Sequence, residues 1–329
     1  MSLEITKAGI LDTIQDGGRH GYQHLGINPG GAMDRFSAQL SNALMGKDLN
    51  APVIEMHFPA AGFLFKKSTI ICLAGADFSA FINDEPIPIH QPVYVKEGSL
   101  LGFKNKKCGA RCYLSILHEM QIEKWLGSYS TNIKAEAGGW QDRQLKASDK
   151  IGLTDMKLFN QQNIRNLLLP WKTDGIKKNF TTRLNVLVGN EWNWLTDISQ
   201  HSFLQNDFQI SINADRMGYR LTGKKIKTKE EKSLLSSAVN FGTIQLLPDG
   251  QLIVLMADHQ TTGGYPRVGH VISADLPFLA QASPNEIINF HLTDLEAAQE
   301  KMIQHQKHLQ QIADACKLKM EKYLLKGET

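Results

Sequence analysis

The chain has 329 residues, a net charge of +3 at neutral pH and a pI near 8.5. Its 42% hydrophobic and 21% charged residues are typical of a folded globular protein and exclude a disordered chain. The basic bias is too weak to indicate a nucleic-acid partner. This length predicts two domains, or at most three.

Targeting and redox signals are absent from the sequence. No run of eighteen apolar residues occurs, so we expect no membrane-spanning helix and no membrane partner. The first residues do not resemble a secretory signal, and we therefore expect a cytoplasmic protein. The four cysteines, Cys72, Cys108, Cys112 and Cys316, are too few for a disulfide framework and lack zinc-site neighbours. We expect reduced, buried thiols and no metal-binding residues.

Short strand-like runs bounded by turn residues dominate both halves of the chain. They recur at a spacing of roughly 8–12 residues, which is typical of a sandwich or barrel and not of alternating strands and helices. The predicted strands are 70–73, 78–82, 93–95, 100–103, 111–117, 184–188, 207–212, 219–221, 244–247, 252–256 and 287–290. The fold class is therefore mainly β with few helices.

Three helices are predicted, at 34–45, 276–281 and 295–325. The first has Asp34 as its N-cap and Gly46 as its stop. The last is long and imperfectly amphipathic, so it either docks on the protein or binds a partner. A basic insertion at 224–237 has a helical tendency, and the segment 155–179 is expected to connect two domains. The predicted domains are 1–180, which is β-rich, 181–295, which is a barrel, and 296–329, which is the C-terminal helix.

Residues 257–266 carry an unusual set of side chains directly after a predicted buried strand. Asp258 and His259 precede Gln260, Thr261, Thr262, Gly263, Gly264 and Tyr265. Paired glycines let backbone N–H groups approach a ligand, and the polar side chains could hold and polarise it. The alternative is an elaborate turn.

Three further clusters combine glycines with charged side chains. They are Asp16-Gly17-Gly18-Arg19, Gly30-Gly31 with Asp34, and Asp215-Arg216. Arg216 could clamp a carboxylate or phosphate in bidentate fashion, and free N–H groups near Asp34 could form an anion site. The alternatives are an Asp16–Arg19 pair across a turn, a simple helix cap at Asp34 and a salt bridge from Asp215 to an arginine.

Several well-known site motifs are excluded. Residues 218–225 have the glycine and lysine spacing of a P-loop, but Lys225 replaces the hydroxyl residue that holds magnesium. The same residues alternate like a strand. No glycine triad lies between a strand and a helix, and neither HExxH nor GxSxG occurs.

Five segments in this order resemble the biotin-dependent carboxyltransferase family, which includes the C subunit of 5-oxoprolinase, also called allophanate hydrolase subunit 2. They are 13–21, 30–35, 74–77, 215–221 and 260–266, and the resemblance covers about residues 3–300. It implies cyclophilin-like β-barrel domains and a multi-subunit hydrolase acting on a cyclic amide. The implied reaction converts 5-oxoproline, ATP and water to glutamate, ADP and phosphate. The implied partners are 5-oxoprolinase subunits A and B, and ATP with Mg is the implied co-substrate.

The chemistry of that reaction suggests roles for the polar clusters. Opening an unstrained lactam needs activation, and phosphorylation of the lactam oxygen followed by attack of water would supply it. Arg19 and Arg216 would hold a carboxylate or phosphoryl group, and Gln260, Thr261 and the Gly263–Gly264 backbone would stabilise an oxyanion. Asp16, Asp34 or Asp258 would move protons or hold magnesium. Tyr265 completes the catalytic candidates, and Gly17, Gly18, Gly30, Gly31, Asp215 and Thr262 are the remaining binding candidates.

Two other functions stay open at this point. The chain could be the acceptor half of a biotin-dependent carboxyltransferase, as in urea carboxylase, and biotin would be a cofactor only in that case. It carries no Met-Lys-Met biotinylation motif of its own. Alternatively, it could be a regulatory protein that binds a kinase inhibitor, because cyclophilin-like folds host binding as well as catalysis.

Overall fold

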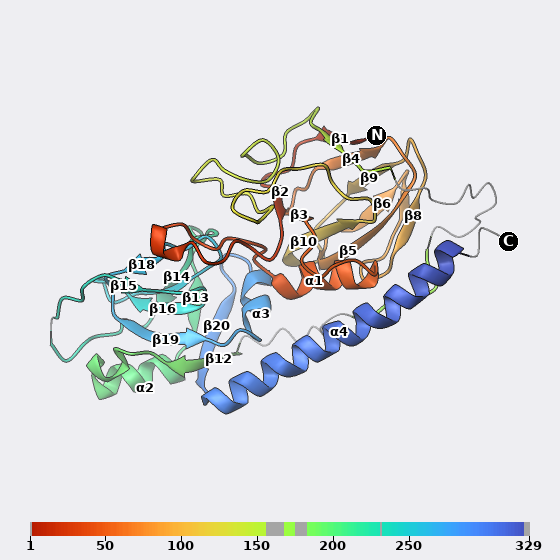
Figure 1. Ribbon diagram of the computed structural model, residues 1–329. Coiled ribbons are helices and arrows are strands. Elements are labelled where there is room, and N and C mark those ends of the chain that lie inside the picture. The colour runs from red at the N-terminus through yellow and green to blue at the C-terminus, as the bar shows by residue number, and fades with distance from the viewer. Residues whose placement is uncertain (1, 156–167, 175–182, 231, 326–329) are drawn as a thin grey trace. The chain divides into compact units, whose positions relative to one another are not determined.

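The computed structural model describes residues 2–155, 168–174, 183–230 and 232–325 (Figure 1). The chain forms two compact units. The first comprises Met1–Gly18, Asp34–Lys177 and Gln306–Thr329, and the second comprises Arg19–Met33 and Lys178–His305. The predicted boundary at 180/181 lies outside the described residues. Residues 19–33 belong to the second unit, although the sequence placed them in the first domain.

The first unit contains two β-sheets. The six-stranded sheet has the order β11-β1-β4-β9-β6-β7 and the five-stranded sheet the order β2-β3-β10-β5-β8. The strands are β1 (Ser2–Lys7), β2 (Thr13–Gln15), β3 (Val53–Met56), β4 (Gly62–Phe65), β5 (Thr69–Asp77), β6 (Ala80–Ile82), β7 (Glu85–Pro86), β8 (Val93–Val95), β9 (Leu100–Phe103), β10 (Cys108–Ile116) and β11 (Lys150–Gly152).

The core of this unit takes side chains from both sheets. Leu3 and Phe63 of the first sheet join one fully buried cluster with Leu73 and Leu114 of the second. Leu73 and Leu114 face each other across β5 and β10. Alternate residues of β1 are buried, as expected for strands that cover a core on one face. The two sheets therefore form a sandwich.

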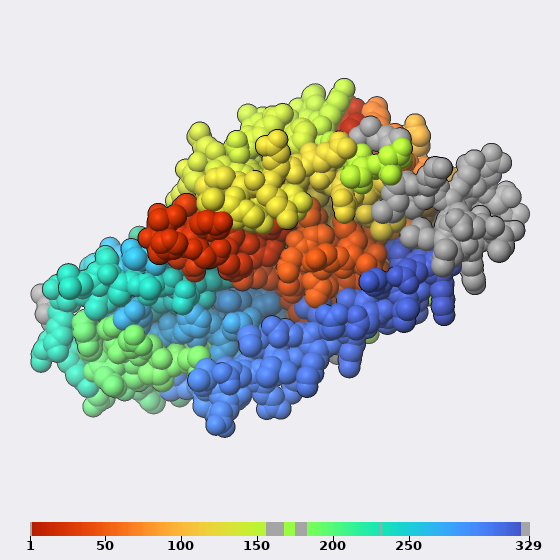
Figure 2. Space-filling model, viewed as in Figure 1, coloured from red at the N-terminus to blue at the C-terminus, as the bar shows by residue number. Residues whose placement is uncertain are grey.

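Two helices cover the other face of the second sheet. Helix α1 (Arg35–Leu44) and helix α4 (Leu295–Leu325) share an apolar cluster that includes Leu40 and Cys316. The Trp171 indole N–H donates to the Leu44 carbonyl over 3.0 Å, and its ring meets Tyr323 edge-on. The outer side of α4, dark blue in Figure 2, is largely exposed. Docking of the C-terminal half of α4 is thus confirmed, and partner binding stays a prediction.

The second unit is a closed seven-stranded barrel with the order β12-β19-β16-β17-β14-β13-β20. Neighbouring strands are antiparallel except β12 and β20, which are parallel. The core of this unit contains several buried aromatic side chains. The Phe203 and Phe290 rings stack with their centroids 4.7 Å apart. The barrel strands are β12 (Arg183–Val188), β13 (Phe208–Ile210), β14 (Gly218–Gly223), β16 (Thr243–Leu246), β17 (Leu252–Leu255), β19 (Arg267–Val271) and β20 (Ile287–Leu292).

Short elements complete the barrel unit. They are the two-stranded pair β15 (Ser237–Ala238) and β18 (Thr262–Gly263), the 3-10 helices η1 (Gln23–Leu25) and η2 (Trp192–Trp194), and helices α2 (Asp197–Gln205) and α3 (Leu276–Gln281). The sequence did not predict α2. That helix has almost no apolar stripe, since Phe203 is buried but Ile198 is 79% exposed.

The predicted fold class is confirmed, and so are most predicted elements. Strands 93–95 and 100–103 and helices 276–281 and 295–325 have the predicted bounds. The helical tendency of 224–237 was wrong: its described residues form no helix, because Ile226 turns into the core and its N–H donates to Gly250. Residues 218–223 form β14, which excludes a P-loop. All four cysteines are free thiols, and three are buried. No helix in the described part of the chain could cross a membrane.

Candidate functional site

The predicted site residues divide between the two units. Asp16, Gly17, Gly18 and Asp34 belong to the first, and all the others belong to the second. Each group has its own hydrogen-bond network.

In the sandwich unit, Asp16 is held by four donors. Its Oδ1 accepts from the hydroxyls of Ser128 and Ser130 at 2.6 Å each and from the Gly18 N–H at 2.8 Å. Its Oδ2 accepts from the Tyr129 N–H at 2.7 Å. These bonds match the acceptor capacity of an ionised carboxylate. They fasten the 128–130 segment to the end of β2, so Asp16 has a positioning role, and a catalytic role stays a prediction.

The glycines after Asp16 have backbone reasons to be glycine. Gly18 has a φ of 90°, which a side chain disfavours. A Cβ on Gly17 would lie 2.8 Å from the Asn50 Oδ1. This turn is therefore shaped by its own contacts, and ligand binding by Gly17 and Gly18 stays a prediction.

Asp34 caps α1, as the sequence predicted. Its carboxylate accepts from the Ser37 N–H at 2.9 Å and from the Ser37 hydroxyl. Its own N–H donates to the Tyr113 hydroxyl over 2.7 Å. The carboxylate thus sits where an external anion would bind at a helix N-terminus, which favours the simple cap over the anion site.

Behind this cap lies a buried charged group that sequence reasoning missed. The Tyr113 hydroxyl donates to Glu55 over 2.9 Å, and the Arg111 Nε lies 4.0 Å from the same carboxylate. Burial raises the pKa of Tyr113 well above its usual value, and Glu55 and Asp34 raise it further. Tyr113 therefore stays a neutral donor. The available signal was the glutamate within the apolar run Val53–Met56, since a charge there must be paired.

In the barrel unit, Arg216 is the centre of a buried group of polar contacts. Its Nε and Nη2 donate to the two oxygens of Asp258 at 2.8 and 3.1 Å. Its Nη2 also donates to the Gly31 carbonyl over 2.7 Å. The two side chains of the pair are only 7% and 10% exposed. Arg216 thus pairs with Asp258 and not with Asp215, whose carboxylate caps the turn to Met217 and Gly218.

Arg19 lies close to the same glycines. It is 1% exposed, and its N–H donates to the Pro29 carbonyl, which closes the segment 19–29. Gly30 and Gly31 have φ values of 60° and 92°, and a Cβ on Gly30 would lie 3.0 Å from the Arg19 Nη1. The structure therefore brings Arg19, Arg216 and the glycine pair together. Both guanidinium groups are buried and Arg216 is already paired with Asp258, so their binding of a carboxylate or phosphoryl group stays a prediction.

The loop 257–266 begins beside this pair and then reaches the surface. The Asp258 N–H donates to the Arg216 carbonyl, and Gly263 pairs with Ser237 in the β15–β18 ribbon. Gln260, Thr262, Gly264 and Tyr265 are exposed, and Thr261 is half-buried. These side chains are accessible to a ligand, whereas the glycine pair at 30–31 is buried.

A polar layer supports the loop from beneath. Gln245, which is 1% exposed, donates to the Tyr265 carbonyl over 3.4 Å, and a Cβ on Gly263 would lie 2.5 Å from its amide nitrogen. Thr243 meets the His270 ring at 3.4 Å. Burial, and then the nearby His259, lower the pKa of His270. Neither residue was a predicted site residue. Gln245 lies on the predicted strand 244–247, and His270 lies on β19, a strand that the sequence did not predict.

Comparison with known proteins gives the protein family of this chain. The chain belongs to the family described as carboxyltransferase domain, subdomain A and B, whose model matches residues 25–292. Within the described residues, no group of three or more His, Cys, Asp or Glu side chains is arranged to hold a metal ion.

Individual relatives refine this class. The chain is 34% identical over 313 residues to the C subunit of 5-oxoprolinase from Escherichia coli (strain K12), covering 94% of this chain and 97% of that protein. It is 29% identical to urea amidolyase of Saccharomyces cerevisiae, but covers only 16% of it. The solved urea carboxylase of Kluyveromyces lactis has a TM-score of 0.85 and 25% identity, over 94% of this chain and 29% of that one. The family resemblance seen in the sequence is confirmed.

Proposed function

We propose that this chain is one component of an ATP-dependent 5-oxoprolinase that acts with subunits A and B. The observation that carries the proposal is the coverage of its relatives. The chain matches nearly the whole of the 5-oxoprolinase C subunit from Escherichia coli, and 94% of that from Haemophilus influenzae at 33% identity. It spans a small part of the urea amidolyases.

The barrel unit has groups suited to the proposed reaction. Arg19 and Arg216 would hold the carboxylate of 5-oxoproline or the transferred phosphoryl group. Gln260 and Thr261 would donate to the oxyanion that forms when water attacks the activated carbonyl. ATP would phosphorylate the lactam oxygen and leave as ADP, which makes the ring carbon electrophilic. Water would add to that carbon, and the ring C–N bond would break to give a free amine and an acyl phosphate. A second water would cleave the acyl phosphate to glutamate and phosphate. Magnesium commonly binds through one or two carboxylates and the nucleotide phosphates, so the reaction requires no dedicated protein cage.

Reconstitution tests this proposal. The chain is mixed with purified subunits A and B, ATP and 5-oxoproline, and glutamate and phosphate are followed together. We expect equal amounts of both products, and none when this chain is omitted. Absence of glutamate from the complete mixture, with each protein folded, would contradict the proposal.

A second candidate function is supported by the family model and by the urea carboxylase structure. This is the acceptor half of a carboxyltransferase, in which a carboxyl group moves from a biotin carrier. An adjacent gene for a biotin carboxylase would favour it, and adjacent genes for subunits A and B would favour the 5-oxoprolinase. Transfer of labelled bicarbonate to an acceptor, without glutamate formation, would establish the second function in place of the first.

A further inference from the structure

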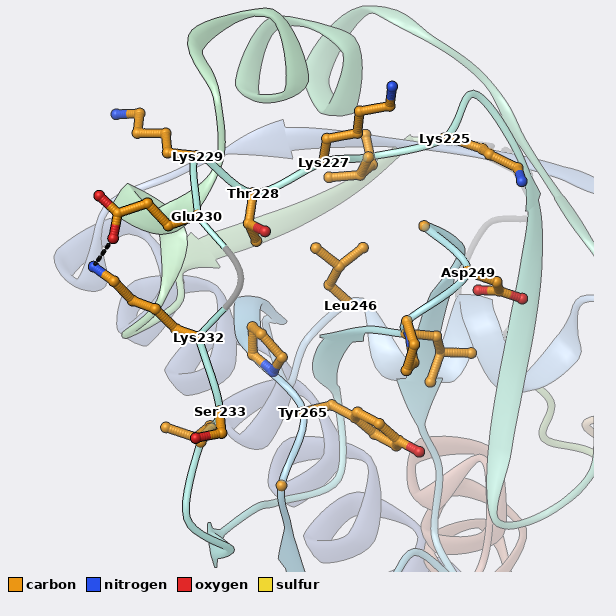
Figure 3. A pocket seen from close by; sticks show the side chains of 17 residues that line it. Lys225, Lys227, Thr228, Lys229, Glu230, Lys232, Ser233, Leu246, Asp249 and Tyr265 are labelled. Carbon is orange, nitrogen blue, oxygen red and sulfur yellow. Dashed lines mark ion pairs between the residues drawn. The ribbon is translucent and has the colours of Figure 1, made fainter.

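A hollow in the barrel unit borders the last residues of the glycine-rich loop. It has a volume of about 1120 Å³ and lies between residues 225–230 and 232–234, the turn 246–250 and residues 264–266 (Figure 3). The loop thus has an outer side that faces this hollow through Tyr265, as well as the inner side that rests on Gln245. The roles proposed above for Arg19 and Arg216 do not use this surface.

The edge of the hollow is basic. Four exposed lysines line it, Lys225, Lys227, Lys229 and Lys232, together with two acidic residues, Glu230 and Asp249. Figure 3 shows Lys229, Lys227 and Lys225 following one another along one edge, with their amino groups spread outward. This arrangement leaves an excess of two positive charges along the edge.

Lys225 and Lys227 carry most of that positive charge, because the other two lysines lie next to carboxylates. Lys232 pairs with Glu230 at 3.1 Å, and Lys229 lies 3.5 Å from the exposed carboxylate of Asp197. In the described part of the chain, Lys225 and Lys227 form no ion pair. Exposed lysines without a partner contribute little to stability, so their clustering here is available for a ligand.

The centre of the hollow is apolar. Leu246 and Leu247 form buried parts of its wall, and Tyr265 exposes 41% of its surface beside them. In Figure 3, Leu246 lies between the lysine edge and Tyr265. An apolar centre with an aromatic anchor and a charged rim is the usual anatomy of a protein–protein interface. A phosphate site would need convergent donors, whereas these amino groups diverge.

We propose that this hollow docks an acidic segment of a partner protein in the complex. The inference rests on the proposed function, which requires such partners. Tyr265 and the leucines would receive apolar side chains of that segment, and Lys225 and Lys227 would attract its carboxylates and speed association. The loop 257–266 would then contact the partner with its outer side, so that docking reaches the segment that carries Gln260.

Charge reversal tests the proposal. The variant Lys225→Glu/Lys227→Glu is compared with Lys7→Glu/Lys96→Glu, which makes the same change of net charge at exposed lysines of the sandwich unit. The Kd for each purified partner, A or B, is measured at low and at high salt. We expect the first variant to raise the Kd for one of them about tenfold or more at low salt, with the difference shrinking at high salt. The control variant should bind like the wild type, and the melting temperature of both variants should be unchanged.

The outcomes separate this inference from the proposed function. Unchanged affinity of the Lys225→Glu/Lys227→Glu variant, in a complex that produces glutamate, would overturn the docking site alone. If the variant loses affinity for a partner and the wild-type complex itself makes no glutamate, the docking site is kept and the 5-oxoprolinase function is overturned. If the variant instead loses binding of ATP or self-association, while binding each partner normally, the occupant is not an acidic partner segment and the inference fails.

Discussion

Removal of the Asp258 charge should destabilise the barrel unit more than removal of any exposed carboxylate. In Asp258→Asn, the Arg216 guanidinium stays buried but loses its charged, bidentate partner, and among these contacts the new amide oxygen and the Gly31 carbonyl are the acceptors that remain. A buried ion pair broken on one side costs about 3–5 kcal/mol, because the remaining charge is desolvated without compensation. Retention of the amide oxygen keeps one acceptor, so we expect about 3 kcal/mol.

Urea unfolding of the purified chain measures this cost, with Glu4→Gln as the control. The Lys66–Glu4 pair is 3.4 Å apart, but its side chains are 48% and 25% exposed. Such surface pairs contribute about 0–1 kcal/mol. A loss in Asp258→Asn no greater than that in Glu4→Gln would refute the reasoning. In the variant Arg216→Met/Asp258→Leu, where no unpaired charge is left, part of the stability should return.

Three further changes have expected outcomes. Gly46→Ala should destabilise the chain by about 2–4 kcal/mol in urea unfolding, since its φ is 66° and a Cβ would lie 2.9 Å from the Lys317 backbone. The control Gly98→Ala, where φ is 80° and the surrounding space is open, should cost only about 1 kcal/mol. Equal losses in the two variants would contradict the docking of α4 at Gly46. Burial raises the pKa of Asp12 from 3.8 to about 7, so the folded state holds a proton that the unfolded state releases. The free energy of unfolding should therefore fall by up to about 4 kcal/mol as pH rises from 4 to 7. Asp12→Asn should remove this dependence, which is measured as the melting temperature against pH. Gln260→Ala should lower glutamate formation about 100-fold without changing the melting temperature, because the side chain is exposed; wild-type turnover would exclude an oxyanion role.

Local patterns predicted the elements that depend on local causes. The N-cap at Asp34 follows from its position before an apolar helical face, and helix 295–325 follows from its length and periodicity. Helix α2 was not predicted because only one of its three buried residues, Phe203, is apolar. The basic run after residue 223 resembled a helix by composition, but Ile226 anchors it in extended form to the turn at Gly250. Tertiary contacts decided both cases.

The candidate site shows the same division between local and distant causes. Glycines with positive φ, such as Gly30 and Gly31, were recognisable as special positions. The partner of Arg216 was not, because Asp258 is 42 residues away and Asp215 is adjacent. Antiparallel pairing of β14 with β17 brings the distant carboxylate to the arginine. Patterns along the chain can therefore identify the residue types of a site, whereas pairing within it follows from strand register.

The paired glycines at 263–264 were expected to let the backbone approach a ligand. The contacts around them instead give a different reason for glycine at each position. Neither has a positive φ. A Cβ on Gly263 would meet the Gln245 amide at 2.5 Å, whereas one on Gly264 would find ordinary contacts from 3.4 Å outward. Gly263 is therefore required by the protein's own polar layer, because that layer must touch the loop from beneath. Ligand recognition by this loop then falls to the exposed side chains on either side of Gly263, with Gln260 before it and Tyr265 after it.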